Sequence, residues 1–158
     1  MKIILASKSG VRKNILEKNN FDCFVVPSNV DEDQVKDSLL AAGANPMLVS
    51  KNLAELKSVK VSNKYPDQIV LGADSVVSLN NQLLNKPKSR EEALEILKKL
   101  NGSTHFLITS VCISKNGAMI WNLTDQSELK MKNLSNEELS AYLKKVSTDA
   151  LLAYGVYQ

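Results

Sequence analysis

The sequence predicts an α/β protein that forms one domain over residues 1–158, with a mixed, twisted sheet flanked by helices. Apolar runs of strand length alternate with segments of helical spacing, which is the pattern of strands joined by helical crossovers. Two short polar segments, Asn80-Asn81 and Lys115-Asn116-Gly117, are typical hairpin turns. Crossovers favour parallel strand pairs and hairpins favour antiparallel pairs, so both kinds are expected in one sheet.

The N-terminal half contains two predicted strands and three predicted helices. Residues 2–6 form a short strand that is apolar after Lys2, and residues 21–26 form a second strand that Pro27 closes. Helical spacing follows at residues 10–19, where Ser9 is the expected N-cap, and at residues 31–42 and 46–61. We expect each helix to place its apolar residues on one face: Val11, Ile15 and Leu16 in the first, Val35, Leu39 and Leu40 in the second, and Leu48, Leu53, Leu56 and Val59 in the third.

The C-terminal half contains the two hairpins and further helices. Residues 69–73 form a buried strand, which residues 76–79 either continue or restart. Strands at 104–114 and 118–132 flank the second hairpin turn. Helices are expected from Ser89 to Leu100 and from Ser135 to about Val146, each opened by a capping box, Ser89 with Glu92 and Ser135 with Glu138. The apolar segment Ala150–Gln158 predicts a last strand, which favours a domain that has been cut short at its C-terminus.

Composition and charge exclude several classes of function. Hydrophobic residues make up 44% of the chain and charged residues 23%, which is ordinary for a soluble globular protein. The formal charge of +3 is too small to indicate nucleic acid as a partner, although it suits a small polyanionic ligand. No apolar stretch approaches the ~18 residues of a membrane span, and no signal peptide is seen. We therefore expect a cytoplasmic protein.

The two cysteines indicate neither a disulfide nor a metal site. Cys23 and Cys112 are far apart in the sequence, and both lie in apolar, strand-like runs. There is no C-x-x-C pair and no zinc-ligand spacing. We expect both to be buried free thiols.

The loop after the first strand has the parts of a phosphate site. Ser7 and Ser9 follow the apolar residues 3–6, and Arg12 lies in the first turn of the helix that comes next. Hydroxyls, a helix N-terminus and a guanidinium can converge there on one polyanion. The alternative is a solvent-exposed loop in which Ser9 only caps the helix.

Asp74 follows the apolar residues 69–73, which places a carboxylate at the end of a buried strand. Ligand sites of α/β proteins gather at such ends. An unpaired carboxylate there would be costly, so we expect Asp74 to hold a metal ion, a water molecule or a cation. The alternative is a turn or cap residue before Ser75. A phosphate-binding loop and a carboxylate that could hold Mg²⁺ together indicate nucleotide chemistry.

Five motifs in a fixed order give the chain a resemblance to a known family. They are Ala6–Arg12, Leu53–Ser58, Gly72–Ser75, Lys86-Pro87, and Gly102–His105 followed by the strand Leu107–Val111. The chain resembles over its whole length the Maf-like family of nucleoside triphosphate pyrophosphatases. In that family these segments read A-S-x-S-P-R-R, L-A-x-x-K-A, G-A-D-T, K-P, and G-x-x-H followed by V-x-T-A-V. The resemblance implies a Maf/ITPase-like α/β fold.

The chain departs from the family pattern in two places. Gly10 and Val11 stand where the family has Pro and its first Arg, so one of two phosphate-facing cations is missing. The sequence ends before three features of the family are complete. These are the A-G-A-Y motif, a closing strand and a C-terminal helix. Tyr154 or Tyr157 could match the motif tyrosine. We prefer Tyr157, because Gln158 then stands where some members have Gln.

The resemblance implies a reaction in which a nucleoside triphosphate is cleaved to a monophosphate and pyrophosphate with the help of Mg²⁺ or Mn²⁺. It makes Asp74 the catalytic residue, and it makes Asp74 and Glu32 the metal ligands. It assigns substrate binding to six residues: Ser7, Ser9, Arg12, Lys57, Lys86 and Thr109.

Each of these residues also has a structural interpretation. A lone lysine is normally a solvated surface residue, which applies to Lys57 and Lys86. Glu32 could instead complement a helix dipole, and Thr109 could be an ordinary strand residue. We do not assign His105 as a general base, because the family motif holds it structurally.

Three readings remain open from the sequence. The first is a pyrophosphatase acting on a pyrimidine or modified nucleoside triphosphate, with 7-methylguanosine triphosphate among the family's substrates. The second is a nucleotide-binding protein without turnover. The third is an inactive or folding-compromised fragment of such an enzyme. Family members are often dimeric, so a homodimer is an expectation taken from the resemblance alone.

Overall fold

The chain forms an α/β structure with a mixed sheet and helices beside it, as the sequence predicts. The computed structural model describes residues 2–154, and every structural statement below refers to that part. Its strands are β1 (Lys2–Leu5), β2 (Asp22–Val25), β3 (Val70–Leu79), β4 (Gln82–Leu84), β5 (Thr104–Lys115) and β6 (Ala118–Lys130). Its helices are α1 (Gly10–Lys18), α2 (Glu32–Ala41), α3 (Pro46–Ser62), α4 (Arg90–Leu100), α5 (Asn136–Lys145) and α6 (Thr148–Tyr154).

The sheet combines parallel and antiparallel pairs. Its strand order is β2-β1-β3-β5-β6, with β4 paired to β3 outside that path. β1 runs parallel to both β2 and β3, whereas β3 and β4 are antiparallel. Residues 76–79 continue the strand that begins at Val70, which decides between the two alternatives left open by the sequence. The described strands therefore confirm the predicted mixed sheet.

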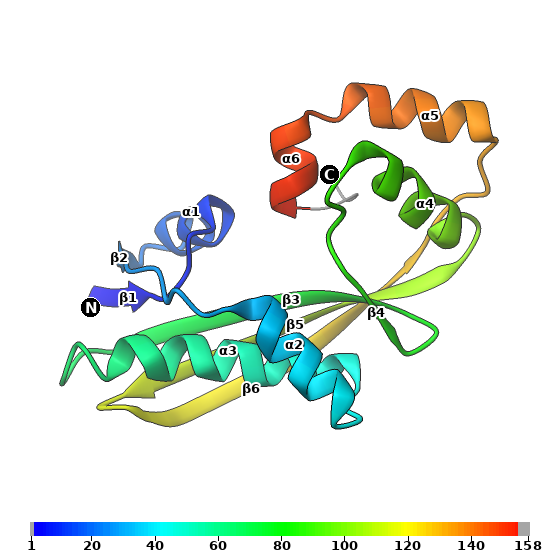
Figure 1. The fold of residues 1–158 in the computed structure, drawn as a ribbon. Coiled ribbons are helices and arrows are strands. Elements are labelled where there is room, and N and C mark those ends of the chain that lie inside the picture. Colours follow the sequence, from blue (N-terminus) through cyan, green and yellow to red (C-terminus); the bar gives the residue numbers. More distant parts are fainter. Residues whose placement is uncertain (1, 155–158) are drawn as a thin grey trace. The chain divides into compact units, whose positions relative to one another are not determined.

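The described residues divide into two compact units. The first unit contains residues 2–75 and 108–126, and the second contains residues 76–107 and 127–154. The first unit holds β1, β2 and the helices α1, α2 and α3 (Figure 1). The second holds α4, α5 and α6. Nearly all of the candidate site residues lie in the first unit.

Helix α3 packs closely against β3 within the first unit. A Cβ atom at Gly72 would overlap the carbonyl oxygen of Ala54 and would lie 2.7 Å from the backbone nitrogen of Ser58. The Ser58 hydroxyl is 2.7 Å from that of Ser114 on β5, and the Ser62 hydroxyl accepts a hydrogen bond from Gly117 N–H at 2.8 Å. These short side chains let the helix backbone approach the sheet, because each hydroxyl finds a partner there.

The buried face of α3 differs from the predicted one. Leu53 is buried, but Leu48 and Leu56 are 46% and 38% exposed. Instead the helix buries small residues, Ser50 and Ser58 among them, together with Lys57. The prediction is confirmed for Leu53 and wrong for Leu48 and Leu56, because it considered only apolar side chains. A face of small hydroxyl residues and a paired lysine can be buried equally well when partners are present.

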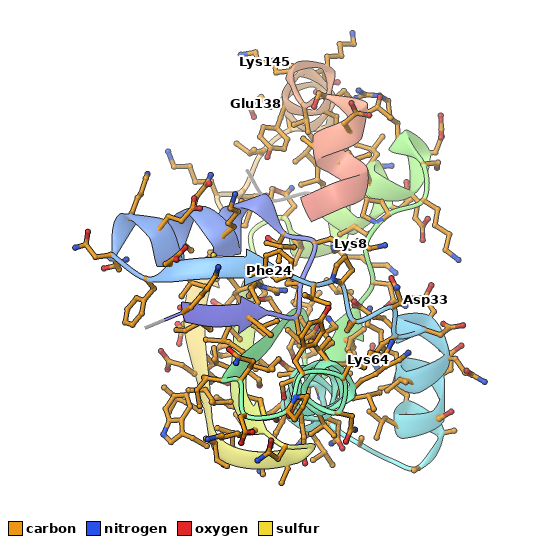
Figure 2. The ribbon with its side chains drawn as sticks, turned by 90° about the vertical axis from the view of Figure 1, so that its left-hand side faces the viewer. Lys8, Phe24, Asp33, Lys64, Glu138 and Lys145 are labelled. Carbon is orange, nitrogen blue, oxygen red and sulfur yellow. The ribbon has the colours of Figure 1, made fainter. Side chains whose placement is uncertain are left out.

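Helix α1 forms where the sequence predicts it, with Ser9 as its N-cap. Its apolar face is only partly covered by other described residues, because Val11 and Ile15 are 50% and 55% exposed and Leu16 is half-buried. The helix contacts β2, whose Phe24 is also exposed and is labelled in Figure 2. The predicted burial of the apolar face of α1 is therefore met only in part, at Leu16.

The second unit has its own apolar core between α4, α5 and α6. The core contains Ala93, Leu97, Leu100, Leu139, Leu143, Val146 and Leu151. The capping box of Ser135 and Glu138 is present at the start of α5, which carries the labels Glu138 and Lys145 in Figure 2. Ser89 caps α4 as predicted, but the Glu92 carboxylate accepts from Lys88 N–H rather than from Ser89 N–H. The reciprocal half of that predicted box is therefore wrong.

The predicted strand at Ala150–Gln158 is wrong in its described part, because residues up to Tyr154 belong to helix α6. The Ser147 hydroxyl accepts a hydrogen bond from Ala150 N–H at 3.2 Å and begins the helix. The Arg90 guanidinium donates to the Val146 carbonyl and to the Thr148 hydroxyl, and the Leu151 side chain is fully buried. Packing against α4 thus overrides the strand-like composition. The alternative registers through Tyr157 and Gln158 lie outside the described residues.

The cysteines agree with the sequence analysis in part. Both are free thiols as expected, but only Cys112 is buried, whereas Cys23 is half-buried. Among the described helices, none has the length and apolar character needed to cross a membrane.

Candidate nucleotide-binding site

The site begins where β1 ends. β1 pairs with β3 only as far as Leu5 and Leu71, and the Ala6 N–H still donates to the Leu71 carbonyl at 2.8 Å. The chain then leaves the sheet through Ser7, whose hydroxyl accepts a hydrogen bond from Ser9 N–H at 3.1 Å. The Ser9 hydroxyl in turn accepts from Arg12 N–H at 3.4 Å as the N-cap of α1. The predicted hydroxyl-rich loop is therefore ordered by its own side chains.

Arg12 connects this loop to the neighbouring strands. Its guanidinium donates to the Ser7 hydroxyl at 3.2 Å and to the Ser75 hydroxyl at 3.4 Å. The Ser75 hydroxyl lies 3.0 Å from that of Thr109 on β5. This row of contacts brings one guanidinium and three hydroxyls together at the end of β1, and such groups can bind phosphate oxygens.

Asp74 lies on β3, just beyond the point where β1 stops pairing with it. Its side chain is buried, and its Oδ1 accepts a hydrogen bond from Lys57 Nζ at 2.7 Å. The same Nζ lies 2.8 Å from Oε1 of Glu32, the first residue of α2. Helices α2 and α3 and strand β3 thus each contribute one charged group to a carboxylate–ammonium–carboxylate cluster. The cluster carries one net negative charge.

Neighbouring residues of a strand point to opposite faces of the sheet. Asp74 therefore faces α3 and Lys57, whereas Ser75 faces Thr109 and Arg12. The Ser50 hydroxyl of α3 donates to the Asp74 carbonyl at 3.2 Å and fixes the strand at this position. Figure 2 labels Lys8 on the loop after β1 and Asp33 in the first turn of α2, which mark the two segments that supply Arg12 and Glu32.

Burial shapes the electrostatics of the site. It raises the pKa of the Asp74 carboxyl above its ordinary value, although the adjacent Lys57 ammonium opposes this shift. It also lowers the pKa of Arg12, while the charges of Asp74 and Glu32 act in the other direction. A carboxylate with a raised pKa is a stronger base than a solvated one, which suits proton transfer from water.

The raised pKa of Asp74 predicts a pH-dependent effect of Asp74→Asn on stability. Folding disfavours ionised Asp74, so the wild type loses free energy of unfolding as pH rises through the raised pKa, relative to a variant that stays neutral. The difference in free energy of unfolding, Asn variant minus wild type, should therefore increase between pH 4 and pH 7.5. Urea unfolding at a series of pH values measures it. A difference that falls with pH would mean that Lys57 holds the pKa of Asp74 down instead.

The donor set fits a small divalent cation. Oδ2 of Asp74 is buried and has no hydrogen-bond partner within the described structure, while Oδ1 is held by Lys57. Among the described residues, no group of three or more His, Cys, Asp or Glu side chains could form a complete metal cage. Mg²⁺ commonly binds through one or two carboxylates, with water and substrate phosphates completing its shell. Asp74 and Glu32 match that pattern.

The structure places seven of the eight predicted site residues in the first unit, in two groups of contacts. Hydrogen bonds join Ser7, Ser9, Arg12 and, through Ser75, Thr109, whereas ion pairs join Glu32, Lys57 and Asp74. Lys86 is exposed and belongs to the second unit, as does His105, which is buried and 3% exposed. Burial lowers the pKa of His105, so its imidazole is neutral at pH 7, which suits the structural role assigned to it.

Two residues of the site were not among the predicted ones. Ser75 links Arg12 to Thr109, and Ser50 holds the backbone of Asp74. The position of Ser75 could have predicted its place in the site. Ser75 directly follows Asp74 in a strand, so its polar side chain must lie on the face of the sheet opposite to Asp74. Nothing in the sequence distinguishes Ser50 from the other serines of α3.

Comparison with known proteins gives consistent matches. A family model described as Maf-like protein matches residues 2–158. A nucleoside triphosphate pyrophosphatase from Pelagibacter ubique is 62% identical over 156 residues, which cover 99% of this chain and 80% of that protein. A 7-methyl-GTP pyrophosphatase from Rhizobium etli is 34% identical over 157 residues, which cover 99% of this chain and 79% of that protein.

The fold has a counterpart among solved structures. A HAM1 protein from Coxiella burnetii superposes with a TM-score of 0.50 over 82% of this chain and 71% of that chain. The two sequences are 14% identical, so this likeness concerns the fold alone.

Proposed function

Since the chain belongs to the Maf-like family, we propose that it hydrolyses a nucleoside triphosphate to the monophosphate and pyrophosphate. The observation that carries the proposal is that a buried carboxylate and the phosphate-type loop after β1 are placed at neighbouring residues of β3. Oδ2 of Asp74 has no partner among the described residues, and Arg12 bonds to Ser75, the next residue. The names of the relatives from Pelagibacter ubique and Rhizobium etli support the same reaction class.

In this reaction a water oxygen attacks the α-phosphorus, and the bond from that phosphorus to the bridging oxygen of the β-phosphate breaks. Asp74 orients the water and accepts its proton, and the electron pair of the broken bond leaves with pyrophosphate. Its raised pKa suits this role, and its burial keeps bulk water away from the carboxylate. Lys57 holds Oδ1, so Oδ2 is the oxygen left for the water.

The triphosphate is bound by groups that are already positioned. Arg12 supplies a guanidinium, Ser7 and Ser9 supply hydroxyls, and the N-terminus of α1 supplies backbone N–H groups. These donors stabilise the negative charge that grows on the phosphate oxygens during the attack. The Thr109 hydroxyl contacts the Ser75 hydroxyl, to which Arg12 donates. Lys86 is proposed as a further phosphate ligand.

We further propose that the reaction depends on Mg²⁺ or Mn²⁺ held by Asp74 and Glu32. Such an ion neutralises charge on the phosphates when it is bound. The arrangement that supports the proposal is the pair of carboxylates formed by buried Asp74 and half-exposed Glu32, which Lys57 joins.

The decisive experiment measures pyrophosphate release from dTTP, UTP, CTP, GTP and 7-methyl-GTP, with Mg²⁺, with Mn²⁺ and with EDTA. We expect turnover on a pyrimidine or 7-methylated substrate that stops when EDTA removes the metal. If a sample that melts cooperatively releases no pyrophosphate from any of them, the protein binds nucleotides without turnover or is an inactive member of the family. A broad or absent melt would favour a protein whose folding is compromised.

Val11 offers a gain-of-function prediction. Its side chain is 50% exposed in the first turn of α1, where the family pattern has an arginine. Val11→Arg should raise kcat/KM about tenfold, because a second cation would stabilise charge on the phosphates. The melting temperature should hardly change, since little apolar contact is lost. Steady-state kinetics with Val11→Gln as the uncharged control tests this, and equal rates for both variants would place position 11 away from the phosphates.

Two further properties follow as proposals. The free thiols Cys23 and Cys112 support a reducing compartment, so we propose that the protein acts in the cytoplasm. The homodimer expected from the family stays a prediction that light scattering can test.

A further inference from the structure

Lys57 is placed unlike a phosphate-binding lysine. Its side chain is 5% exposed, and its Nζ lies 2.7 Å from Oδ1 of Asp74 and 2.8 Å from Oε1 of Glu32. A lysine that binds phosphate in an open site is normally solvated before the phosphate binds, because its long side chain is flexible and its ammonium is strongly hydrated. The Lys57 ammonium is instead enclosed by the two carboxylates to which we assign the metal.

An ammonium and a divalent metal ion compete for the same oxygens. Both are compact positive charges that bind carboxylate oxygen, and Lys57 occupies one oxygen of each of the two carboxylates. With Lys57 in place, a free metal ion meets one net negative charge rather than two, and one oxygen of each carboxylate is already engaged. Repulsion between the ammonium and a dication is strong at such short range in a buried site.

The same contacts keep the site assembled without a metal. Two carboxylates from different elements would repel each other, and Asp74 would be buried without compensation. Lys57 prevents both because it reaches Asp74 and Glu32 from α3, at the helix position where the backbone also packs on Gly72. A triphosphate brings additional ligands for the metal, so the ion has enough partners to displace the ammonium only when the nucleotide is present.

We propose that Lys57 is a positioning residue that stands in for the metal ion, holding Asp74 and Glu32 in place until a metal–nucleotide complex displaces its ammonium. This inference rests on the proposed function and adds an order of binding. The protein takes up free metal weakly, and metal and nucleoside triphosphate strengthen each other's binding. If Lys57 only contacted phosphate, its charge would affect nucleotide affinity and leave the affinity for free metal unchanged.

The first test measures Mn²⁺ binding to the nucleotide-free protein by calorimetry and by the electron paramagnetic resonance signal of free Mn²⁺. Lys57→Met keeps the length of the side chain and removes its charge. We expect it to bind Mn²⁺ about tenfold or more tightly than the wild type. Lys51→Met removes one charge from an exposed position of the same helix and should bind Mn²⁺ as the wild type does. Equal or weaker binding by Lys57→Met overturns the proposal.

The second part of this test concerns coupling. Mn²⁺ affinity is measured again with an α,β-methylene triphosphate that cannot be cleaved. The wild type should gain much more affinity from the nucleotide than Lys57→Met does, because Lys57→Met has no ammonium to displace. The same gain in both proteins would overturn the proposed displacement.

A measurement on the unmodified protein removes the risk that Lys57→Met fails to fold. In protein labelled with ¹⁵N-lysine, the buried Lys57 ammonium should give a cross-peak that is protected from exchange with water. Mg²⁺ alone should leave this cross-peak unchanged, whereas Mg²⁺ with the methylene triphosphate should shift or abolish it. A shift caused by Mg²⁺ alone would contradict the proposal.

These results separate the inference from the proposed function. Turnover by the wild type, together with unchanged Mn²⁺ affinity in Lys57→Met, would support the pyrophosphatase activity and overturn the proposed role of Lys57. Tight Mn²⁺ binding by Lys57→Met, without turnover of any nucleotide by the wild type, would support the role of Lys57 at an ion site and overturn the pyrophosphatase activity. Absence of Mn²⁺ binding in every variant, with and without the nucleotide, would overturn the role of Lys57 and the proposed metal dependence together.

Discussion

Asp74→Asn should lower turnover by about 100-fold or more, which is the range expected when a general base is removed. The amide of Asn cannot accept a proton from the attacking water, and it is a poor ligand for a divalent metal. The substitution nearly preserves the size of the side chain, so the fold should persist. Pyrophosphate release measures the effect, and circular dichroism with a thermal melt checks that the variant is folded.

Asp67→Asn is the matched control for this prediction. Asp67 belongs to the same unit, lies in an exposed turn and has a φ of 63°, a backbone conformation that Asn tolerates well. This chemically identical substitution should leave turnover near the wild-type value. Activity of Asp74→Asn above about a tenth of wild type would argue against a role for Asp74 in handling water or metal.

Gly72→Ala should destabilise the protein by about 2 kcal/mol, although it adds only one methyl group. The new Cβ would overlap the Ala54 carbonyl oxygen and would lie 2.7 Å from the Ser58 nitrogen. Both atoms belong to the backbone of α3, so no side-chain rotation can relieve the overlap. The helix must move away from β3, which should lower Tm by roughly 4–8 °C in a chain of this size.

The same substitution should reduce activity, because α3 carries Lys57 and β3 carries Asp74. A shift of a few tenths of an ångström between these elements disturbs the contact of 2.7 Å that joins the two side chains. Gly10→Ala is the control for stability, since a Cβ at Gly10 would meet no atom within 4 Å. If Gly72→Ala melts like Gly10→Ala, the close packing of α3 on β3 does not limit the size of the side chain at position 72.

Most elements could be located from local patterns. The helices that begin at Gly10, Pro46 and Asn136 start where a capping residue precedes a helical run, and capping depends on residues three or four positions apart. The hairpin turns at Asn80-Asn81 and at Asn116-Gly117 were readable because both pairs adopt positive φ, which these residue types favour. The motif around Asp74 was also recognisable from a local pattern, because its residues are adjacent in the chain.

Other features depended on what each segment packs against. Residues 150–154 have the composition of a strand, yet they form part of a helix because Ser147 caps it and Leu151 completes the core of the second unit. The buried face of α3 was misjudged because the burial of Ser50 and Lys57 depends on partners from β3 and α2. A pattern of apolar residues carries no information about such partners.

By itself the sequence determined the fold class, the order of most elements and the family, and it predicted seven site residues that the structure places in the first unit. Only the tertiary structure decided what those residues do to one another. It placed Lys57 between Asp74 and Glu32, turned Ser75 toward Arg12 and left Oδ2 of Asp74 without a partner among the described residues. The physical reason is that charge pairing and burial are set by distances between elements far apart in the chain, whereas capping, turns and motifs are set within a few residues.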